Sequence, residues 1–243
     1  LSKILLRSGL FMKKLLALVM SICMLITFAI PLSVPVGADP AQDDGLVLYL
    51  PFDTADGNTS PDTTGGGHDA TLMGNAALAE GISGQALDLN GSVGTYADLP
   101  DGTNMLMGDA YTISVWANKR VDQGYDRLFD FGNDTQKYVM YCTARGAGAA
   151  GYFAITENSN GAEQSINNTS TMPLNQWVNI TITYANNTAV LYQDGLEIGR
   201  NSGVTLTPDS FGEFVNCWLG RSMWPADAYF NGLIDEFKIY NRA

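Results

Sequence analysis

The segment AYTISVWANK (residues 110–119) alternates between apolar and polar side chains along most of its length. Ile113, Val115 and Ala117 fall on one face of an extended chain, and the residues between them fall on the other. The segment WVNITITYA (177–185) alternates in the same way. A period of two predicts β-strands that are buried on one face, rather than helices.

Further strand signals surround these two segments. GLVLYLPF (45–52) is continuously apolar, and AVLYQDGLEIGR (189–200) contains Asp194-Gly195, a dipeptide suited to a tight hairpin turn. The C-terminal stretch YFNGLIDEFKIYNRA (229–243) also alternates, which predicts that Leu233, Asp235, Phe237 and Ile239 share one side. No stretch sustains the apolar spacing of a capped helix. The sequence therefore predicts an all-β fold, a two-sheet antiparallel sandwich, in one domain.

The N-terminal residues have the pattern of a targeting segment. An apolar run at residues 15–30 follows Lys13-Lys14, and small residues at Val36-Gly37-Ala38 precede Asp39. This pattern predicts a secretory signal peptide that is cleaved after Ala38. The alternative is a membrane anchor, but the run is shorter than the roughly 20 residues that a bilayer-spanning helix needs.

These features divide the chain into three parts. Residues 1–38 hold the signal peptide and some residues upstream of Met12, 39–44 form a short linker, and 45–243 form the domain. We expect a secreted, extracellular protein that touches the membrane only through the signal peptide before cleavage.

Charge and cysteine content exclude several functions. The chain has 13 basic and 25 acidic residues, and its net charge of −12 makes nucleic acid an unfavourable partner. A single histidine, His68, leaves no room for a multi-histidine metal centre. Two of the three cysteines, Cys142 and Cys217, follow the signal peptide; they form either one disulfide or two separate buried thiols.

Seven segments in a fixed order resemble the LamG-like (laminin G-like, concanavalin A-like) domain family. They are GLVLYLPFD, DTTGGGHDATLMG, GQALDLNG, YTISVWANK, QWVNITITY, AVLYQDGLEIGR and NGLIDEFKIYNRA. The resemblance covers residues 45–242 and implies a jelly roll of two curved antiparallel sheets. Bacterial domains of this family are often attached to secreted glycoside hydrolases, including arabinan- and xylan-degrading enzymes. The resemblance thus implies a carbohydrate-binding module, either free-standing or covalently linked to a hydrolase domain.

Acidic residues beside a glycine-rich loop predict a structural calcium ion. The loop carries Asp62 and runs to Gly65-Gly66-Gly67 and His68, so it is rich in the oxygen ligands that calcium prefers. The family resemblance implies that Asp53, the carbonyl of His68 and Asp235 surround this ion. The alternatives are turn capping by Asp53 and Asp62, and hydrogen bonds from backbone amides to Asp235.

Catalysis is not expected from this sequence. Glycoside hydrolysis needs two carboxylates held across the scissile bond. The ExDxxE arrangement of laminarinase-like enzymes is absent, because none of the six glutamates has an aspartate two residues downstream. His68 lies in a glycine-rich loop and has no nucleophile-elbow motif nearby.

Two segments carry the aromatic and polar side chains that sugar-binding sites use. They are GYDRLFDFGNDTQKYVMY (124–141) and NCWLGRSMWPADAYFNG (216–232). Trp116 and Trp177 lie within alternating strands and are assigned to the core. The candidate sugar-binding residues are Trp224, Tyr229, Arg221, Asp227, Tyr125 and Arg127.

The two arginines have an alternative role. Arg221 and Arg127 could instead form structural ion pairs with Asp126, Asp130 or Asp227. The sequence as a whole predicts a secreted, calcium-stabilised module that binds a polysaccharide or glycan without cleaving it. The alternatives are a protein-binding or adhesion module, and a structural spacer domain of a larger extracellular enzyme.

Overall fold

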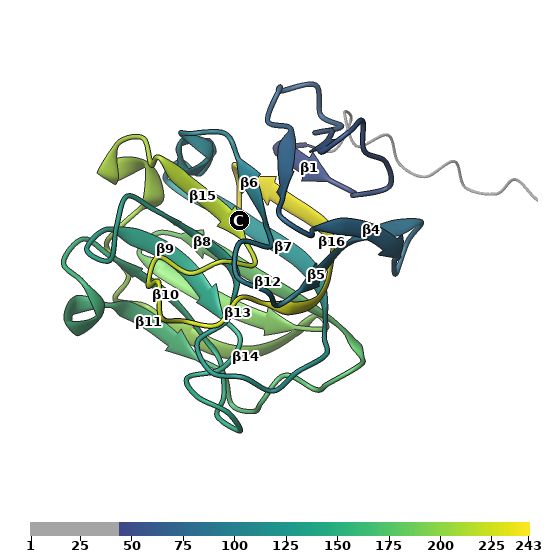
Figure 1. Cartoon of the computed structure of the whole chain (residues 1–243). Helices are drawn as coiled ribbons and strands as arrows, with labels where there is room; N and C mark the ends of the chain where they lie inside the picture. The colour runs from purple at the N-terminus through teal and green to yellow at the C-terminus, as the bar shows by residue number, and fades with distance from the viewer. Residues whose placement is uncertain (1–43) are drawn as a thin grey trace, which may run out of the picture. The chain divides into compact units, whose positions relative to one another are not determined.

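The computed structural model describes residues 44–243, which form an antiparallel β-sandwich (Figure 1). The predicted all-β class is confirmed. The expected signal peptide at 1–38 and all but Asp44 of the expected linker lie outside the described residues. Among residues 44–243, no helix has both the length and the apolar character needed to cross a membrane.

Sheet A has eight antiparallel strands. They are β1 (Leu46–Leu50), β4 (Ala77–Glu80), β5 (Gln85–Asn90), β7 (Ala110–Lys119), β12 (Trp177–Ala185), β13 (Thr188–Gln193), β14 (Leu196–Asn201) and β16 (Asn231–Tyr240). Their spatial order is β14-β13-β12-β7-β16-β5-β4, and β1 pairs with β16. The two alternating segments that predicted strands therefore lie side by side at the centre of this sheet (Figure 1).

Sheet B has eight strands in the order β11-β10-β9-β8-β15-β6-β3-β2. They are β2 (Thr59–Ser60), β3 (Ala70–Met73), β6 (Tyr96–Leu99), β8 (Arg127–Gly132), β9 (Tyr138–Cys142), β10 (Tyr152–Thr156), β11 (Gln164–Asn167) and β15 (Asn216–Leu219). Three short 3₁₀ helices complete the described fold: η2 (Thr103–Leu106), η3 (Asn160–Ala162) and η4 (Pro208–Phe211).

One hydrophobic core fills the space between the two sheets. Ile113 and Val115 of β7 are fully buried in it, as the alternation predicted, and Phe129 and Phe131 of β8 enter it from the other side. Full burial of such a side chain stabilises the fold by roughly 1.5–3 kcal/mol. The sandwich therefore rests mainly on the inward faces of its two sheets.

The outer face of sheet B is also covered. A second apolar cluster there includes Tyr138, Met140 and Tyr152, and Trp224 packs against it. Trp224 belongs to the segment at residues 220–230, which we call the covering loop. β8, β9 and β10 are buried on both faces, and Trp224 of this loop contributes to that burial.

Two predictions about individual side chains are wrong. Leu233 does not share a face with Phe237, because the register of β16 shifts between Asp235 and Lys238 and Glu236 has a positive φ of 51°. Trp116 and Trp177 are not core residues: each lies half-buried on the outer face of sheet A, where alternation with buried neighbours places it.

The two cysteines of the described chain are separate. Cys142 in β9 and Cys217 in β15 are both buried free thiols. Of the two alternatives that the sequence left open, the structure shows the unpaired thiols.

Candidate functional site

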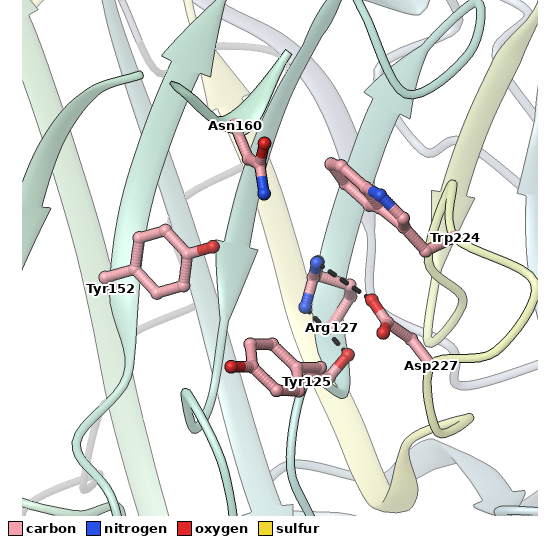
Figure 2. Close-up of a pocket in the computed structure, with 6 residues that line it drawn as sticks. All are labelled: Tyr125, Arg127, Tyr152, Asn160, Trp224 and Asp227. Atoms are coloured by element: carbon pink, nitrogen blue, oxygen red, sulfur yellow. Dashed lines mark hydrogen bonds and ion pairs between the residues drawn. The ribbon is translucent and has the colours of Figure 1, made fainter. Parts of the chain in front are cut away.

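A pocket of about 200 Å³ opens on the outer face of sheet B (Figure 2). It lies where β8 and β10 pass beside the covering loop, so its walls come from segments that are far apart in the sequence. The lining residues are Tyr125, Arg127, Tyr152, Asn160, Trp224 and Asp227.

Arg127 lies at the centre of the pocket, and its side chain is only 2% exposed (Figure 2). Its Nη1 donates to the carbonyl oxygen of Tyr125 at 2.7 Å, and its Nη2 donates to Oδ2 of Asp227 at 3.2 Å. Its Nε lies 3.5 Å from Oδ2 of Asp130. A planar guanidinium held by three partners has a fixed orientation, so it is a rigid hydrogen-bonding element.

The covering loop holds Asp227 in place. The Ser222 hydroxyl donates to Oδ2 of Asp227 at 2.7 Å, and it accepts a hydrogen bond from the Trp224 backbone N–H at 3.1 Å. The backbone N–H of Asp227 donates to the carbonyl of Trp224 at 3.1 Å. These bonds leave Oδ1 of Asp227 without a partner among the described residues, so this oxygen can accept a hydrogen bond from a ligand.

Trp224 forms one wall of the pocket. Its ring packs edge-on against Tyr138, with 5.0 Å between the ring centroids and 79° between the planes. The Arg127 Cζ lies 5.7 Å from the centroid of the same indole. The indole is half-buried, so part of it stays open to the pocket. An aromatic face fixed in this way can stack on the C–H groups of an apolar or amphipathic ring.

Tyr125 occupies a strained position at the edge of the pocket. Its φ of 60° lies in the left-handed region, which is a real outlier for a bulky residue. Its N–H donates to the carbonyl of Ala144 at 2.7 Å, and its own carbonyl accepts the bond from Arg127. The side chain is 46% exposed, so its burial does not explain the strain. Strain of this kind clusters at functional sites.

Tyr152 lies across the pocket from Trp224 (Figure 2), and its ring stacks against the guanidinium of Arg145. The Cζ of Arg145 lies 3.5 Å from the centroid of the Tyr152 ring. Arg145 also pairs with Glu163 at 3.8 Å, and Glu163 accepts a hydrogen bond of 2.7 Å from the Tyr138 hydroxyl. The orientation of Tyr152 is thus supported by this cation–π contact and by a hydrogen bond of 3.4 Å from its hydroxyl to Glu163.

A buried carboxylate lies behind the pocket. Oδ2 of Asp130 accepts a hydrogen bond from the Met223 backbone N–H at 2.9 Å, while Oδ1 is buried without a partner. Complete burial raises the pKa of Asp130 to about 7, although Arg127 opposes this effect. Asp130 therefore links the floor of the pocket to the covering loop and titrates near neutral pH.

Four of the six predicted sugar-binding residues line this one pocket: Tyr125, Arg127, Trp224 and Asp227. The other two lie beside it. Arg221 stacks over Trp218, with its Cζ 3.7 Å from the ring centroid, and Tyr229 packs near Tyr96. The alternative role of Arg127 is also realised, since it forms ion pairs with Asp130 and Asp227.

Sequence reasoning missed two lining residues, Tyr152 and Asn160. Tyr152 begins β10, and Asn160 begins η3 at the end of the following turn. No local pattern marks either residue, because only the pairing of β10 with β9 brings this segment beside β8.

The four predicted calcium ligands fall into two groups with different hydrogen-bond partners. Asp53 and Asp235 both face the turn between β4 and β5: Asp53 accepts a bond from Gln85 N–H, and Asp235 accepts bonds from Ile82 and Ser83 N–H. The third N–H bond to Asp235 comes from Glu236.

Asp62 instead organises the glycine-rich loop. Its carboxylate accepts hydrogen bonds from the backbone N–H groups of Tyr49, Thr64 and His68. Within residues 44–243, no three histidine, cysteine, aspartate or glutamate side chains group as metal ligands. These carboxylates fit hydrogen bonding to amides, which is the alternative that the sequence left open, and calcium stays a prediction.

The family described as the concanavalin A-like lectin/glucanases superfamily matches residues 90–243. An α-L-arabinofuranosidase of Bifidobacterium longum is 26% identical over 225 residues, which cover 84% of this chain. The chain spans only 20% of the length of that enzyme.

The fold also resembles solved binding domains. Domain 4 of AbnA, an extracellular arabinanase from Geobacillus stearothermophilus solved with arabinotriose, gives a TM-score of 0.63 at 23% identity. That match covers 80% of this chain and 91% of the domain. The binding domain of a botulinum neurotoxin, serotype D/C, gives a TM-score of 0.63 at 18% identity. That match covers 82% of this chain and 49% of the neurotoxin chain. Identities this low show the shared fold alone.

Proposed function

Since the chain belongs to the concanavalin A-like lectin/glucanases superfamily, we propose that it binds carbohydrate in the pocket around Arg127. In this proposal residues 45–243 are a non-catalytic module that serves a polysaccharide-degrading glycoside hydrolase. Its target is a polysaccharide or glycan of plant type.

The observation that carries the proposal is the convergence of Tyr125, Arg127, Trp224 and Asp227 on one pocket. A sugar ring has an apolar C–H face and a rim of hydroxyl groups. An aromatic wall stacks on the C–H face, while a fixed guanidinium and a carboxylate oxygen form hydrogen bonds with the hydroxyl groups. Because the supporting contacts exist without a ligand, little conformational entropy is lost on binding.

The link to a hydrolase draws on two relatives. One is an arabinofuranosidase and the other is a domain of an arabinanase, so this chain is proposed to act beside such an enzyme. A module of modest affinity raises the local concentration of a tethered enzyme on its substrate. The expected signal peptide would send the protein to the same extracellular polysaccharide.

The exposed apolar residues do not favour a protein-binding role. Among the larger ones, Val93 follows β5 near one edge of sheet A, while Leu196 begins β14 at the other edge. Scattered apolar residues are normal on a soluble surface, whereas a protein interface needs a contiguous patch.

The test is calorimetric titration of the purified full chain with arabinotriose, preceded by a screen against a glycan array. We expect saturable binding that Trp224→Ala weakens at least tenfold. Trp116→Ala is the matched control, because Trp116 is also half-buried but lies on the outer face of sheet A. The proposal would be overturned if no glycan gave saturable binding. Equal losses of affinity in the two variants would show that the sugar does not bind in this pocket.

A further inference from the structure

We infer that the pocket takes one neutral sugar ring at the end of a glycan chain, with two adjacent hydroxyls on Arg127 and Asp227. This inference rests on the proposed function and narrows it to a ligand class and a binding mode. Three observations carry it: the size and rim of the pocket, the arrangement of its polar atoms and the pairing of its charges.

In the view of Figure 2, the labelled side chains surround Arg127, and together they line the pocket. Trp224 and Tyr152 face each other across it, and Asn160 and Tyr125 lie at the other two sides. A polysaccharide that runs through a site needs an entrance and an exit, as in an open groove. A pocket of about 200 Å³ that is based on a buried arginine and rimmed by four side chains instead fits the terminal ring of a chain.

Arg127 and Asp227 present a donor and an acceptor side by side. The Arg127 Nη2 lies 3.2 Å from Oδ2 of Asp227, and Oδ1 of Asp227 has no partner among the described residues. Each sugar hydroxyl can both donate and accept a hydrogen bond. Two adjacent hydroxyls can therefore engage this pair, one accepting from the guanidinium and the other donating to the carboxylate, whereas a ring position that is used in a glycosidic linkage has no hydroxyl to donate.

The charged side chains that line the pocket, and Arg145 behind Tyr152, are already paired. Arg127 pairs with Asp130 and Asp227, and Arg145 pairs with Glu163. An acidic sugar would bring another carboxylate close to Asp227 without gaining an unpaired cation in the pocket. Since like charges at short range repel, the pocket selects neutral sugars over uronic acids.

The experiment compares chain lengths. The full chain is titrated with the neutral trimer and hexamer of arabinose, of xylose and of glucose, and with trigalacturonate. For the sugar that binds, we expect one protein per oligosaccharide for both lengths and dissociation constants within threefold of each other. Trigalacturonate is expected to bind at least tenfold more weakly than the neutral trimer.

Asp227→Asn tests the polar pair directly. The amide keeps the shape of the side chain but presents a donor in place of one acceptor oxygen, so we expect at least a tenfold loss of affinity. The matched control is Asp88→Asn, because Asp88 also pairs with an arginine, Arg120, but lies in sheet A. If Asp227→Asn does not fold, Asn160→Ala replaces it, since Asn160 is exposed and its loss leaves the Arg127 contacts intact.

The outcomes separate the two proposals. If no neutral oligosaccharide binds, the proposed function fails and this inference fails with it. If the trimer binds but the hexamer binds more than tenfold more tightly, or if one hexamer binds several protein molecules, sugar binding is supported. Either result would contradict the chain-end mode. Equal affinity for trigalacturonate would show that the pocket does not select neutral sugars.

Discussion

The Arg127 guanidinium lies 3.2 Å from the Asp227 carboxylate, although 100 positions separate the two residues in the chain. This pair joins β8 to the covering loop and lies between the aromatic walls of the pocket. Its geometry is fixed from both sides, by Tyr125 on the arginine and by Ser222 on the aspartate. The same contact therefore stabilises the fold and forms part of the proposed ligand site.

Replacing Arg127 by methionine should strongly destabilise the fold. The change removes the cation but leaves Asp130 buried, and breaking a buried ion pair by removing one partner costs about 3–5 kcal/mol. Urea unfolding at pH 7 measures the loss. Arg200→Met is the control, because Arg200 pairs with Glu197 at an exposed position, and it should leave the free energy of unfolding unchanged. A loss in Arg127→Met no larger than in this control would contradict the prediction.

Stability should fall as the pH rises from about 4 towards 7, because of Asp130. Burial raises the pKa of this carboxyl to about 7 in the folded chain, while an unfolded aspartate titrates near ~3.9. Between these values the folded state binds one more proton than the unfolded state. The contribution of this proton to the free energy of unfolding is therefore fully present below pH 4 and is lost as the pH approaches 7.

The Asp130 contribution is measured as the difference between wild type and Asp130→Asn in urea unfolding at pH 4.5 and 7.5. A tenfold difference in proton affinity between the folded and unfolded states corresponds to ~1.4 kcal/mol. The variant should lose less stability than the wild type over this interval, because an amide does not titrate. Parallel pH profiles for the two proteins would rule out this role for Asp130.

Tyr125→Gly should weaken sugar binding without destabilising the fold. Glycine tolerates the φ of 60° at this position, so the substitution relieves a strain of roughly 1–3 kcal/mol. The added flexibility of glycine costs about 0.5–1 kcal/mol, which leaves stability equal or slightly higher. Calorimetry should show several-fold weaker binding of arabinotriose, since one wall of the pocket is lost. Unchanged affinity together with lower stability would mean that the tyrosine ring is structural.

Asp235→Asn should lower the melting temperature equally with calcium and with EDTA. Its carboxylate accepts three backbone N–H bonds, and the amide nitrogen of asparagine cannot accept them. The family resemblance predicts instead that calcium stabilises the wild type and that the variant loses this response. Thermal unfolding of the wild type and the variant in the two buffers decides between these two predictions. A difference that depends on calcium would establish that Asp235 binds the metal.

Reducing agent should not change the melting temperature. Cys142 and Cys217 are free, and burial raises the pKa of Cys142 to about 11, so its thiol stays protonated and unreactive in the folded chain. Thermal unfolding with and without dithiothreitol measures this. A drop of several degrees in dithiothreitol would reveal a disulfide that stabilises the fold.

The fold was predictable because its signals are local. Alternation in 110–119 and 177–185 was sufficient to identify the two strands that lie together at the centre of sheet A. The alternation failed at Leu233, since the bulge at Asp235–Glu236 shifts the register by one residue and no sequence pattern marks it. It also says which residues share a face but not whether that face is inside, which is why Trp116 and Trp177 were misplaced.

The sequence by itself determined the β-class, the strand segments and four residues of the pocket, because alternation and loop aromatics are properties of short stretches. Only the tertiary structure decided that residues 125–127, 152–160 and 224–227 meet in one place. That meeting depends on the pairing of β8, β9 and β10 and on the covering loop that packs over them. Contacts between residues about 100 positions apart leave no periodic trace in the chain, so the pocket emerges only when the sheets assemble.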